Sequence, residues 1–159
     1  MRNATIQILR ILLLIVVAGI ALLQGFILPL MASQYAEIYP EVAYLAVPFT
    51  VIFQLVLLGA EVIVVCIWML LSMVAEDSIF SSKAFRFVDV IIGTLLAMAA
   101  ILLGVQVYLS AILNADPPAV AIVLIGGLTG CATLAALMLV MRGLLKKATE
   151  MDEFMSEVA

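Results

Sequence analysis

The chain alternates between long apolar stretches and short charged connections. No charged residue occurs within 11–36, 90–115 or 117–141, and a further apolar stretch over 48–74 contains a single one, Glu61. About 20 apolar residues suffice for a helix to cross a bilayer, and helix is the default because lipid offers the backbone no hydrogen-bond partner. The alternating pattern of a membrane barrel strand is absent. The pattern predicts four spanning helices, at about 8–31, 48–74, 87–113 and 119–145.

Composition supports a membrane protein and excludes several function classes. Hydrophobic residues make up 67% of the chain and charged residues 11%, whereas soluble domains average about 45–50% and about 25%. So few charged residues cannot cover the water-exposed surface of a soluble enzyme. The net charge of −4 argues against direct binding of nucleic acid. Because the chain has no histidine, imidazole metal sites and Ser-His triads are excluded, and we expect neither an enzyme nor a bound cofactor.

The basic residues predict how the four spans are oriented. All seven fall on one side of a four-span chain: Arg2, Arg10, Lys83, Arg86, Arg142, Lys146 and Lys147. The connections on the other side contain only acidic charges, Glu37, Glu41 and Asp116. Lysine and arginine concentrate in cytoplasmic segments, so both termini are expected in the cytoplasm. Short connections favour an all-α, up-down four-helix bundle, with 1–147 as the transmembrane domain and 148–159 as a cytosolic tail.

Local signals predict where the helices begin and end. Pro48 is suited to the first turn of the second span, where a missing N–H is harmless. Asp116 is a suitable N-cap for the fourth span, and Ser81 or Ser82 for the third. Pro29 is expected to kink or stop the first span near its end.

Glu61 is the polar residue most at odds with its surroundings. It lies near the middle of the second span, where a charge costs about 2.5–3.5 kcal/mol, so we expect its carboxyl to be protonated or hydrogen-bonded. Gln24, Gln54 and Gln106 come from three different spans and are expected to form a polar layer nearer the outer face. Gln54 and Glu61 are seven residues apart and share a helix face. The cluster serves either to link helices by hydrogen bonds or as a functional site for protons or cations.

Two stripes of small residues are candidates for close helix packing. Gly126 and Gly130 form a GxxxG motif in the fourth span, and Gly93 and Ala97 begin a similar stripe in the third. Small residues let helix backbones approach closely. The stripes serve either packing within the bundle or contact with a second copy of the chain.

The segment after the fourth span has a heptad-like apolar pattern. The pattern has spacings of four and three residues and consists of Leu144, Ala148, Met151, Met155 and Val158. This spacing predicts that the span continues as a short cytosolic helix. Its far end is acidic, with Glu150, Asp152, Glu153 and Glu157. The extension is either a solvated helix end or a docking surface for another helix or a cytosolic protein.

The loop before the third span carries a family resemblance. Its sequence at 76–86, running into 88–93, resembles the central signature of the bacterial family called domain of unknown function 2975, and the segments 39–45 and 140–149 are similar to that family too. The motif is Ile-Phe-Ser at 79–81; many members carry Asn three residues after the Ser, where this chain has Ala84. The resemblance implies a four-span protein of the bacterial inner membrane without an assigned activity or catalytic residues. Members are often encoded beside a small helix-turn-helix regulator.

Two functional hypotheses follow. In the first, the chain is a non-enzymatic protein of the lipid bilayer that acts by protein interaction, sequestering a small cytosolic DNA-binding regulator or sensing the state of the envelope. In the second, it is a small transporter or channel subunit, oligomeric and linked to protons or cations through Glu61. Replacing Glu61 with Gln and following flux in proteoliposomes discriminates between them.

Overall fold

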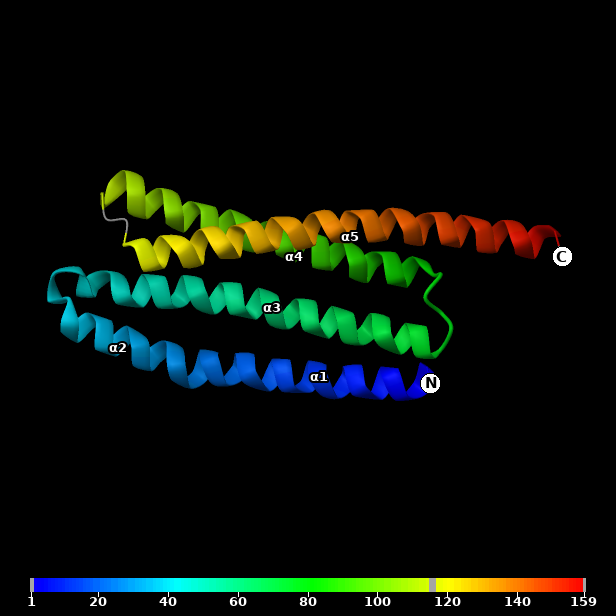
Figure 1. Cartoon of the computed structure of the whole chain (residues 1–159), viewed down its shortest axis with the longest axis horizontal. Coiled ribbons are helices and arrows are strands. Elements are labelled where there is room, and N and C mark those ends of the chain that lie inside the picture. Colours follow the sequence, from blue (N-terminus) through cyan, green and yellow to red (C-terminus); the bar gives the residue numbers. More distant parts are fainter. Residues whose placement is uncertain (1, 115–116, 159) are drawn as a thin grey trace. The chain divides into compact units, whose positions relative to one another are not determined.

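The described part of the chain is helical apart from its connecting turns. The computed structural model describes residues 2–114 and 117–158. Its elements are α1 (Arg2–Leu22), the π-helical turn η1 (Leu23–Ile27), α2 (Leu28–Ile38), the 3-10 helix η2 (Pro40–Leu45), α3 (Ala46–Ala75), α4 (Ser82–Val107), the π-helical turn η3 (Tyr108–Ile112) and α5 (Pro118–Val158) (Figure 1). No strand occurs among these residues, so the all-α prediction is confirmed.

Four continuous helical stretches are long and apolar enough to cross a membrane. They are Arg2–Ile38, Pro40–Ala75, Ser82–Ile112 and Pro118–Val158. Each of the four predicted spans lies inside one of them to within one residue. The last stretch exceeds its predicted span most, because the helix continues through the segment after 145. The helical extension expected from the heptad-like spacing is therefore observed.

Pro29 does not end the first helical stretch. It lies just after η1, and the helix continues as α2 to Ile38. A π-helical turn before a proline widens the helix and so makes room for the proline ring, which would otherwise clash with the preceding turn. The expectation that Pro29 could stop the helix was wrong, whereas a local distortion next to it is observed.

The other predicted helix ends are partly as expected. Pro48 is the third residue of α3 and lies in its first turn, as predicted. Ser81 occupies the N-cap position of α4 with an extended backbone, but its hydroxyl makes no capping hydrogen bond. Its backbone carbonyl instead accepts the N–H of Ala84 at 3.1 Å. The proposed N-cap Asp116 lies outside the described residues.

A Schellman-type turn ends α3. The backbone N–H of Ser78 donates to the carbonyl of Met73 at 2.9 Å, and that of Asp77 donates to the carbonyl of Val74 at 3.2 Å. Asp77 adopts the left-handed conformation that this motif requires, with φ of 55°. The turn lies within the loop that carries the family-like sequence.

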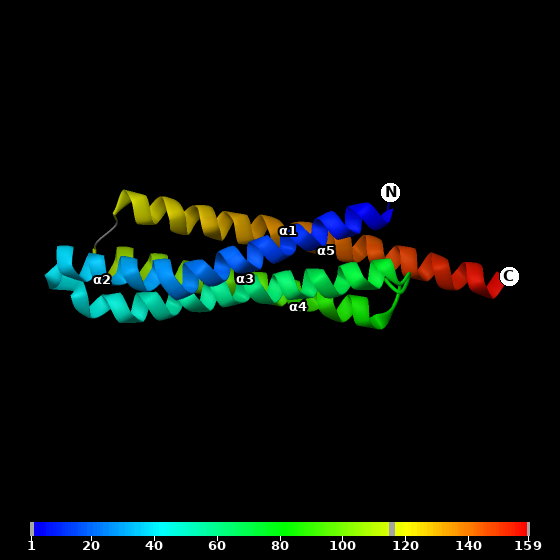
Figure 2. The ribbon, with the colours of Figure 1, turned by 90° about the horizontal axis from the view of Figure 1, so that it is seen from below.

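The chain divides into two compact units, Met1–Trp68 (unit 1) and Met69–Ala159 (unit 2). Within unit 1 the stretch from α1 to α2 runs antiparallel to α3, and within unit 2 α4 runs antiparallel to α5 (Figures 1 and 2). Each unit therefore contains an antiparallel helix pair. The assembly of all four helices into one bundle stays a prediction.

Unit 2 is held by a regular apolar seam between α4 and α5. The buried residues of α4 and η3 recur at spacings of three, four or seven, and include Ala84, Val88, Ile91, Leu95, Leu102, Val105 and Leu109; those of α5 are Leu124, Cys131 and Ala135. This heptad spacing is typical of left-handed helix pairs in which side chains interlock.

Candidate functional site

Three polar residues of the predicted intramembrane cluster meet within unit 1. Gln54 and Glu61 lie on one face of α3, two turns apart, and Gln24 lies in η1. The structure brings these three together, and we call them the Glu61 cluster. Gln106 lies on α4 in unit 2, so the predicted layer of three glutamines stays a prediction.

Gln54 holds the backbone of η1. Its side-chain Nε2 donates to the backbone carbonyl of Gln24 at 2.7 Å. That carbonyl has lost its usual donor, because the N–H of Leu28 instead reaches the carbonyl of Leu23 in the π-helical turn. The next residue that could donate is Pro29, which has no N–H. The Gln54 side chain on α3 thus supplies the hydrogen bond that Pro29 cannot give to the Gln24 carbonyl. This bond joins the two helices.

The side chain of Gln24 reaches Glu61. The Gln24 amide is oriented so that both of its ends have partners. Its Nε2 donates to Oε1 of Glu61 at 2.9 Å, and its own Oε1 accepts the backbone N–H of Leu58 at 3.1 Å. Gln24 and Glu61 are both half-buried within the described structure. The carboxyl therefore has a hydrogen-bonding partner from a second helix, as the sequence predicted in one of its two alternatives.

A third contact lies on the same face of α3. The guanidinium of Arg10 lies over the ring of Trp68, 5.5 Å from its centroid, in cation–π geometry. Gln54, Glu61 and Trp68 are spaced by seven residues, and each contacts the first helical stretch. From the sequence, Arg10 was expected only to mark the cytoplasmic side, and its contact with Trp68 was not predicted. The seven-residue spacing from Glu61 to Trp68 is the signal that could have found it.

The Glu61 cluster consists of one carboxyl and two amides, which are groups that exchange hydrogen bonds with one another. No group of three or more His, Cys, Asp or Glu side chains within 2–114 and 117–158 could hold a metal ion. A carboxyl and an amide do offer one another complementary donors and acceptors in either protonation state of the carboxyl. This is the chemistry from which the functional proposals start.

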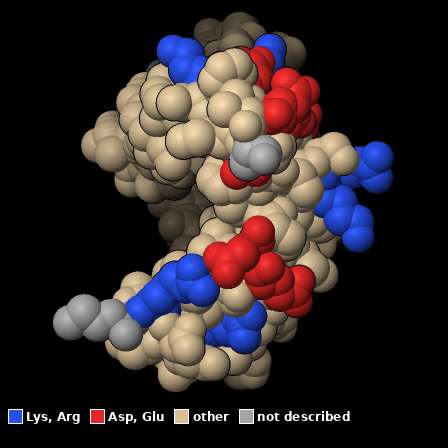
Figure 3. All heavy atoms as spheres, turned by 90° about the vertical axis from the view of Figure 1, so that its right-hand side faces the viewer, with Lys and Arg blue, Asp and Glu red and all other residues tan. Residues whose placement is uncertain are grey.

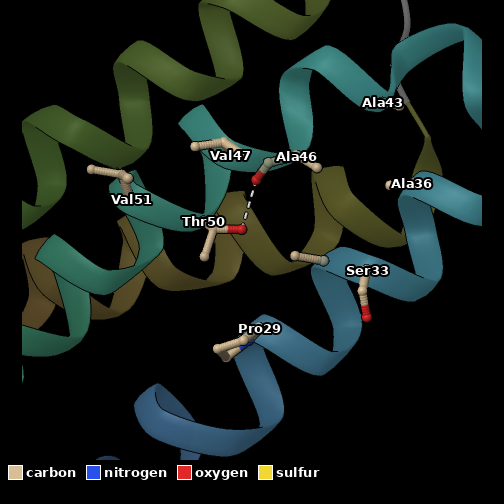
Figure 4. A pocket seen from close by; sticks show the side chains of 9 residues that line it. Pro29, Ser33, Ala36, Ala43, Ala46, Val47, Thr50 and Val51 are labelled. Atoms are coloured by element: carbon tan, nitrogen blue, oxygen red, sulfur yellow. Dashed lines mark hydrogen bonds between the residues drawn. The ribbon is translucent and has the colours of Figure 1, made fainter.

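An apolar groove of about 400 Å³ lies between α2 and the start of α3 (Figure 4). Among the lining residues only Ser33 and Thr50 have polar side chains. Both hydroxyls donate to carbonyls of their own helices, Ser33 to Leu30 at 2.8 Å and Thr50 to Ala46 at 2.6 Å. The groove thus presents alkyl surface and no polar group aimed at a ligand, which distinguishes it from a binding site for a polar molecule.

In unit 2, the charged side chains of the two helices lie near the beginning of α4 and along the last part of α5, and basic and acidic side chains are both seen in Figure 3. Unit 2 has an ion pair there, in which Nε of Arg142 on α5 donates to Oδ1 of Asp89 on α4 at 2.6 Å. The same guanidinium lies over the ring of Phe85, 5.8 Å from its centroid. The pair links the two helices near the end at which α4 begins.

The small-residue stripes lie beside the seam of unit 2. Gly93, Ala97, Gly126 and Gly130 are exposed, and a Cβ added at any of the three glycines would meet no atom within 4 Å. The close approach of α5 to α4 falls instead on Gly127, where an added Cβ would lie 3.1 Å from Cδ1 of Leu102. Packing of the GxxxG face on another helix or another copy stays a prediction.

Comparison with known proteins gives a family for the chain. No curated protein and no solved structure matches it. A family described as "Protein of unknown function (DUF2975)" matches residues 30–158. This match covers α3, α4, α5 and most of α2, and it includes Gln54 and Glu61 but not Gln24. The resemblance seen in the sequence is thereby confirmed, and the chain belongs to the DUF2975 family.

Proposed function

We propose that this chain is a multi-pass protein of the bacterial cytoplasmic membrane, with both termini in the cytoplasm, that acts without catalysis by binding a cytosolic protein. The orientation is supported by the seven basic residues, which the order of the helices assigns to one side. Binding is assigned to the last part of α5, residues 148–158, which we call the tail helix.

The length of α5 carries this proposal. Its 41 residues extend about 61 Å at 1.5 Å per residue, whereas the hydrocarbon core of a bilayer is about 30 Å thick. The tail helix therefore extends beyond the membrane. Four of its apolar side chains are between 67% and 73% exposed: Met151, Phe154, Met155 and Val158. Their spacing of three, one and three residues places them on one face. A helix in water normally buries such an apolar face against another surface.

Charge indicates the partner that suits this face. The tail helix contains four acidic residues and no basic ones between 148 and 158. A DNA-binding protein must carry a basic surface, so a small regulator of this kind is the partner that the acidic and apolar tail helix complements. The family's frequent pairing with a helix-turn-helix regulator supports the same partner. Binding to the tail helix would hold the regulator at the membrane and cover its DNA-binding surface.

The test uses the full chain in nanodiscs and a purified helix-turn-helix regulator of the kind often encoded beside members of the family. We expect Phe154→Ser and Glu150→Lys, one turn before Phe154, each to weaken regulator binding at least tenfold, and operator DNA to compete with the membrane protein. Ser156→Gln, on another face of the tail helix, is the matched control and should leave affinity unchanged. Undiminished binding after deletion of 148–159 would refute the proposal, as would simultaneous binding of the regulator to DNA and to this protein.

A second candidate function is a proton-linked or cation-linked transporter or channel subunit. The observation in its favour is the contact between Gln24 and Glu61 at 2.9 Å, because a carboxyl held by a neighbouring helix inside a membrane is typical of ion and proton pathways. Glu61→Gln should abolish proton-coupled flux in proteoliposomes. Flux that persists in this variant would rule the candidate out.

A further inference from the structure

We propose that Glu61 and Gln24 form a proton-binding site in which the Gln24 amide reverses when Glu61 takes up a proton. This inference is independent of the tail helix. It deepens the second candidate function, because a proton-linked role of Glu61 would rest on such a site. The ligand is a proton: hydronium gives it to the carboxylate and leaves water, and no other covalent bond is made or broken.

The ionised state is accommodated by one orientation of the amide. A carboxylate only accepts hydrogen bonds, and Nε2 of Gln24 donates to its Oε1 at 2.9 Å. The amide oxygen then accepts from the N–H of Leu58 at 3.1 Å. Both ends of the Gln24 side chain have partners of the correct kind.

The protonated state is accommodated by the reversed orientation. A protonated carboxyl carries an O–H donor, and a half-turn of the amide places its oxygen toward Glu61 to accept that bond. Nε2 then lies 3.5 Å from the backbone carbonyl of Gln54 and takes the place of the oxygen that accepted from Leu58, so that bond is lost. The oxygen and nitrogen of an amide occupy nearly equivalent positions, so the exchange requires no movement of the rest of the side chain.

The backbone of Gln24 stays in place during the exchange. Its carbonyl accepts from Nε2 of Gln54 at 2.7 Å, a bond that does not involve the reversing amide. Proton uptake at Glu61 therefore leaves the contact between η1 and α3 intact. Because the Glu61 carboxyl keeps the Gln24 amide as its partner in both states, it avoids the cost of an unpaired polar group in an apolar environment.

Few other charged or titratable groups share the packed elements of unit 1. Those described on α1, α2, η2 and the turn before it are Arg2, Arg10, Tyr35, Glu37, Tyr39, Glu41 and Tyr44; α3 adds Cys66 within unit 1. Arg10 lies over Trp68, seven residues from Glu61 and about 10 Å along α3. The group seen facing Glu61 at hydrogen-bond distance is the uncharged Gln24.

Infrared difference spectroscopy of the full chain in nanodiscs, titrated over the pH range in which it stays folded, tests the site. Glutamine side chains labelled with ¹⁵N identify amide bands. We expect a carboxylic C=O band that is lost in Glu61→Gln and a glutamine amide band that changes with the same midpoint. Gln24→Met should remove the amide change and shift the carboxyl midpoint. The matched control Gln106→Met should alter neither.

Three results would overturn the proposal. The first is a carboxyl of Glu61 that does not titrate, and the second is a Glu61 band that titrates identically in wild type and Gln24→Met. The third is displacement of the proton by Na⁺ or K⁺ at constant pH, which would make this a cation site. Gln24→Asn, whose shorter amide cannot reach the carboxyl, provides the same comparison if Gln24→Met does not fold. A normal titration without flux would disprove the second candidate function and leave the proton site standing.

Discussion

The hydrogen bond from Gln54 to the backbone of Gln24 should matter because Pro29 removes the alternative. Gln54→Leu leaves the Gln24 carbonyl without the donor that lies 2.7 Å away. In Pro29→Ala, residue 29 regains an N–H, and the carbonyl can be satisfied within its own helix. We therefore expect Gln54→Leu to be costly in the wild-type background and much less costly in the Pro29→Ala background.

The magnitude follows from the environment of the bond. Hydrogen bonds between membrane helices contribute about 0.6 kcal/mol on average and about 1.7 kcal/mol at most. An unsatisfied buried carbonyl costs about 1–3 kcal/mol. The carbonyl of Gln24 lies in an otherwise apolar helix pair, so Gln54→Leu should lower the free energy of unfolding by about 1–2 kcal/mol. With alanine at position 29 the loss should fall to about 0.5 kcal/mol or less.

The assay is reversible unfolding in mixed micelles, with all four members of the double-mutant cycle measured under the same conditions. Thr50→Val is the matched control on α3, one turn before Gln54. Its hydroxyl donates to the carbonyl of Ala46 within the same helix, so its loss leaves no group between helices unpaired. An equal cost of Gln54→Leu in both backgrounds would refute the link between the proline and this bond.

Three further predictions concern unit 2. Gly127→Leu should lower the free energy of unfolding by about 1–3 kcal/mol through overpacking, as measured by the same unfolding titration, whereas Gly130→Leu should change it little because an added Cβ there meets nothing within 4 Å. A double-mutant cycle of Asp89→Asn and Arg142→Gln should give a coupling of about 0.2–1 kcal/mol that decreases with salt, since these side chains are 53% and 40% exposed. Asp77→Val should lower the free energy of unfolding by about 1–2 kcal/mol in a thermal melt, because a β-branched residue is strained at a φ of 55°.

The sequence predicted the helices well because each depends on local properties. Length and apolar character alone decide whether a segment suits a membrane-spanning helix, and α3 and α5 begin within two residues of the positions expected from their prolines. The continuation of α5 to Val158 also followed from the spacing of its apolar residues. Pro29 was less predictable, because a proline can either end a helix or be absorbed by a π-helical turn, and its neighbours on another helix influence which occurs.

The candidate site was predicted in part. Glu61, Gln54 and Gln24 were identified because polar groups are costly in lipid, and this cost is independent of the fold. The contact of Arg10 with Trp68 was missed because it joins residues 58 positions apart, and cation–π pairs leave no short motif. Gly127, rather than the GxxxG pair, is the glycine at which an added Cβ would contact α4, because the seam through Leu124 and Cys131 sets which face of α5 is turned inward.

The sequence by itself determined that the chain forms four long apolar helices, and that the carboxyl of Glu61 needs a partner. Composition and charge placement suffice for this, since the backbone and polar side chains must find hydrogen bonds wherever water is absent. Only the tertiary structure decided which partner each group obtains. The register between η1 and α3 places the side chain of Gln54 where it can donate to the Gln24 carbonyl, which Pro29 leaves without a donor in its own helix. The same register places the side-chain amide of Gln24 where it can donate to the Glu61 carboxyl. That register depends on the packing of whole helix faces, which no single segment specifies.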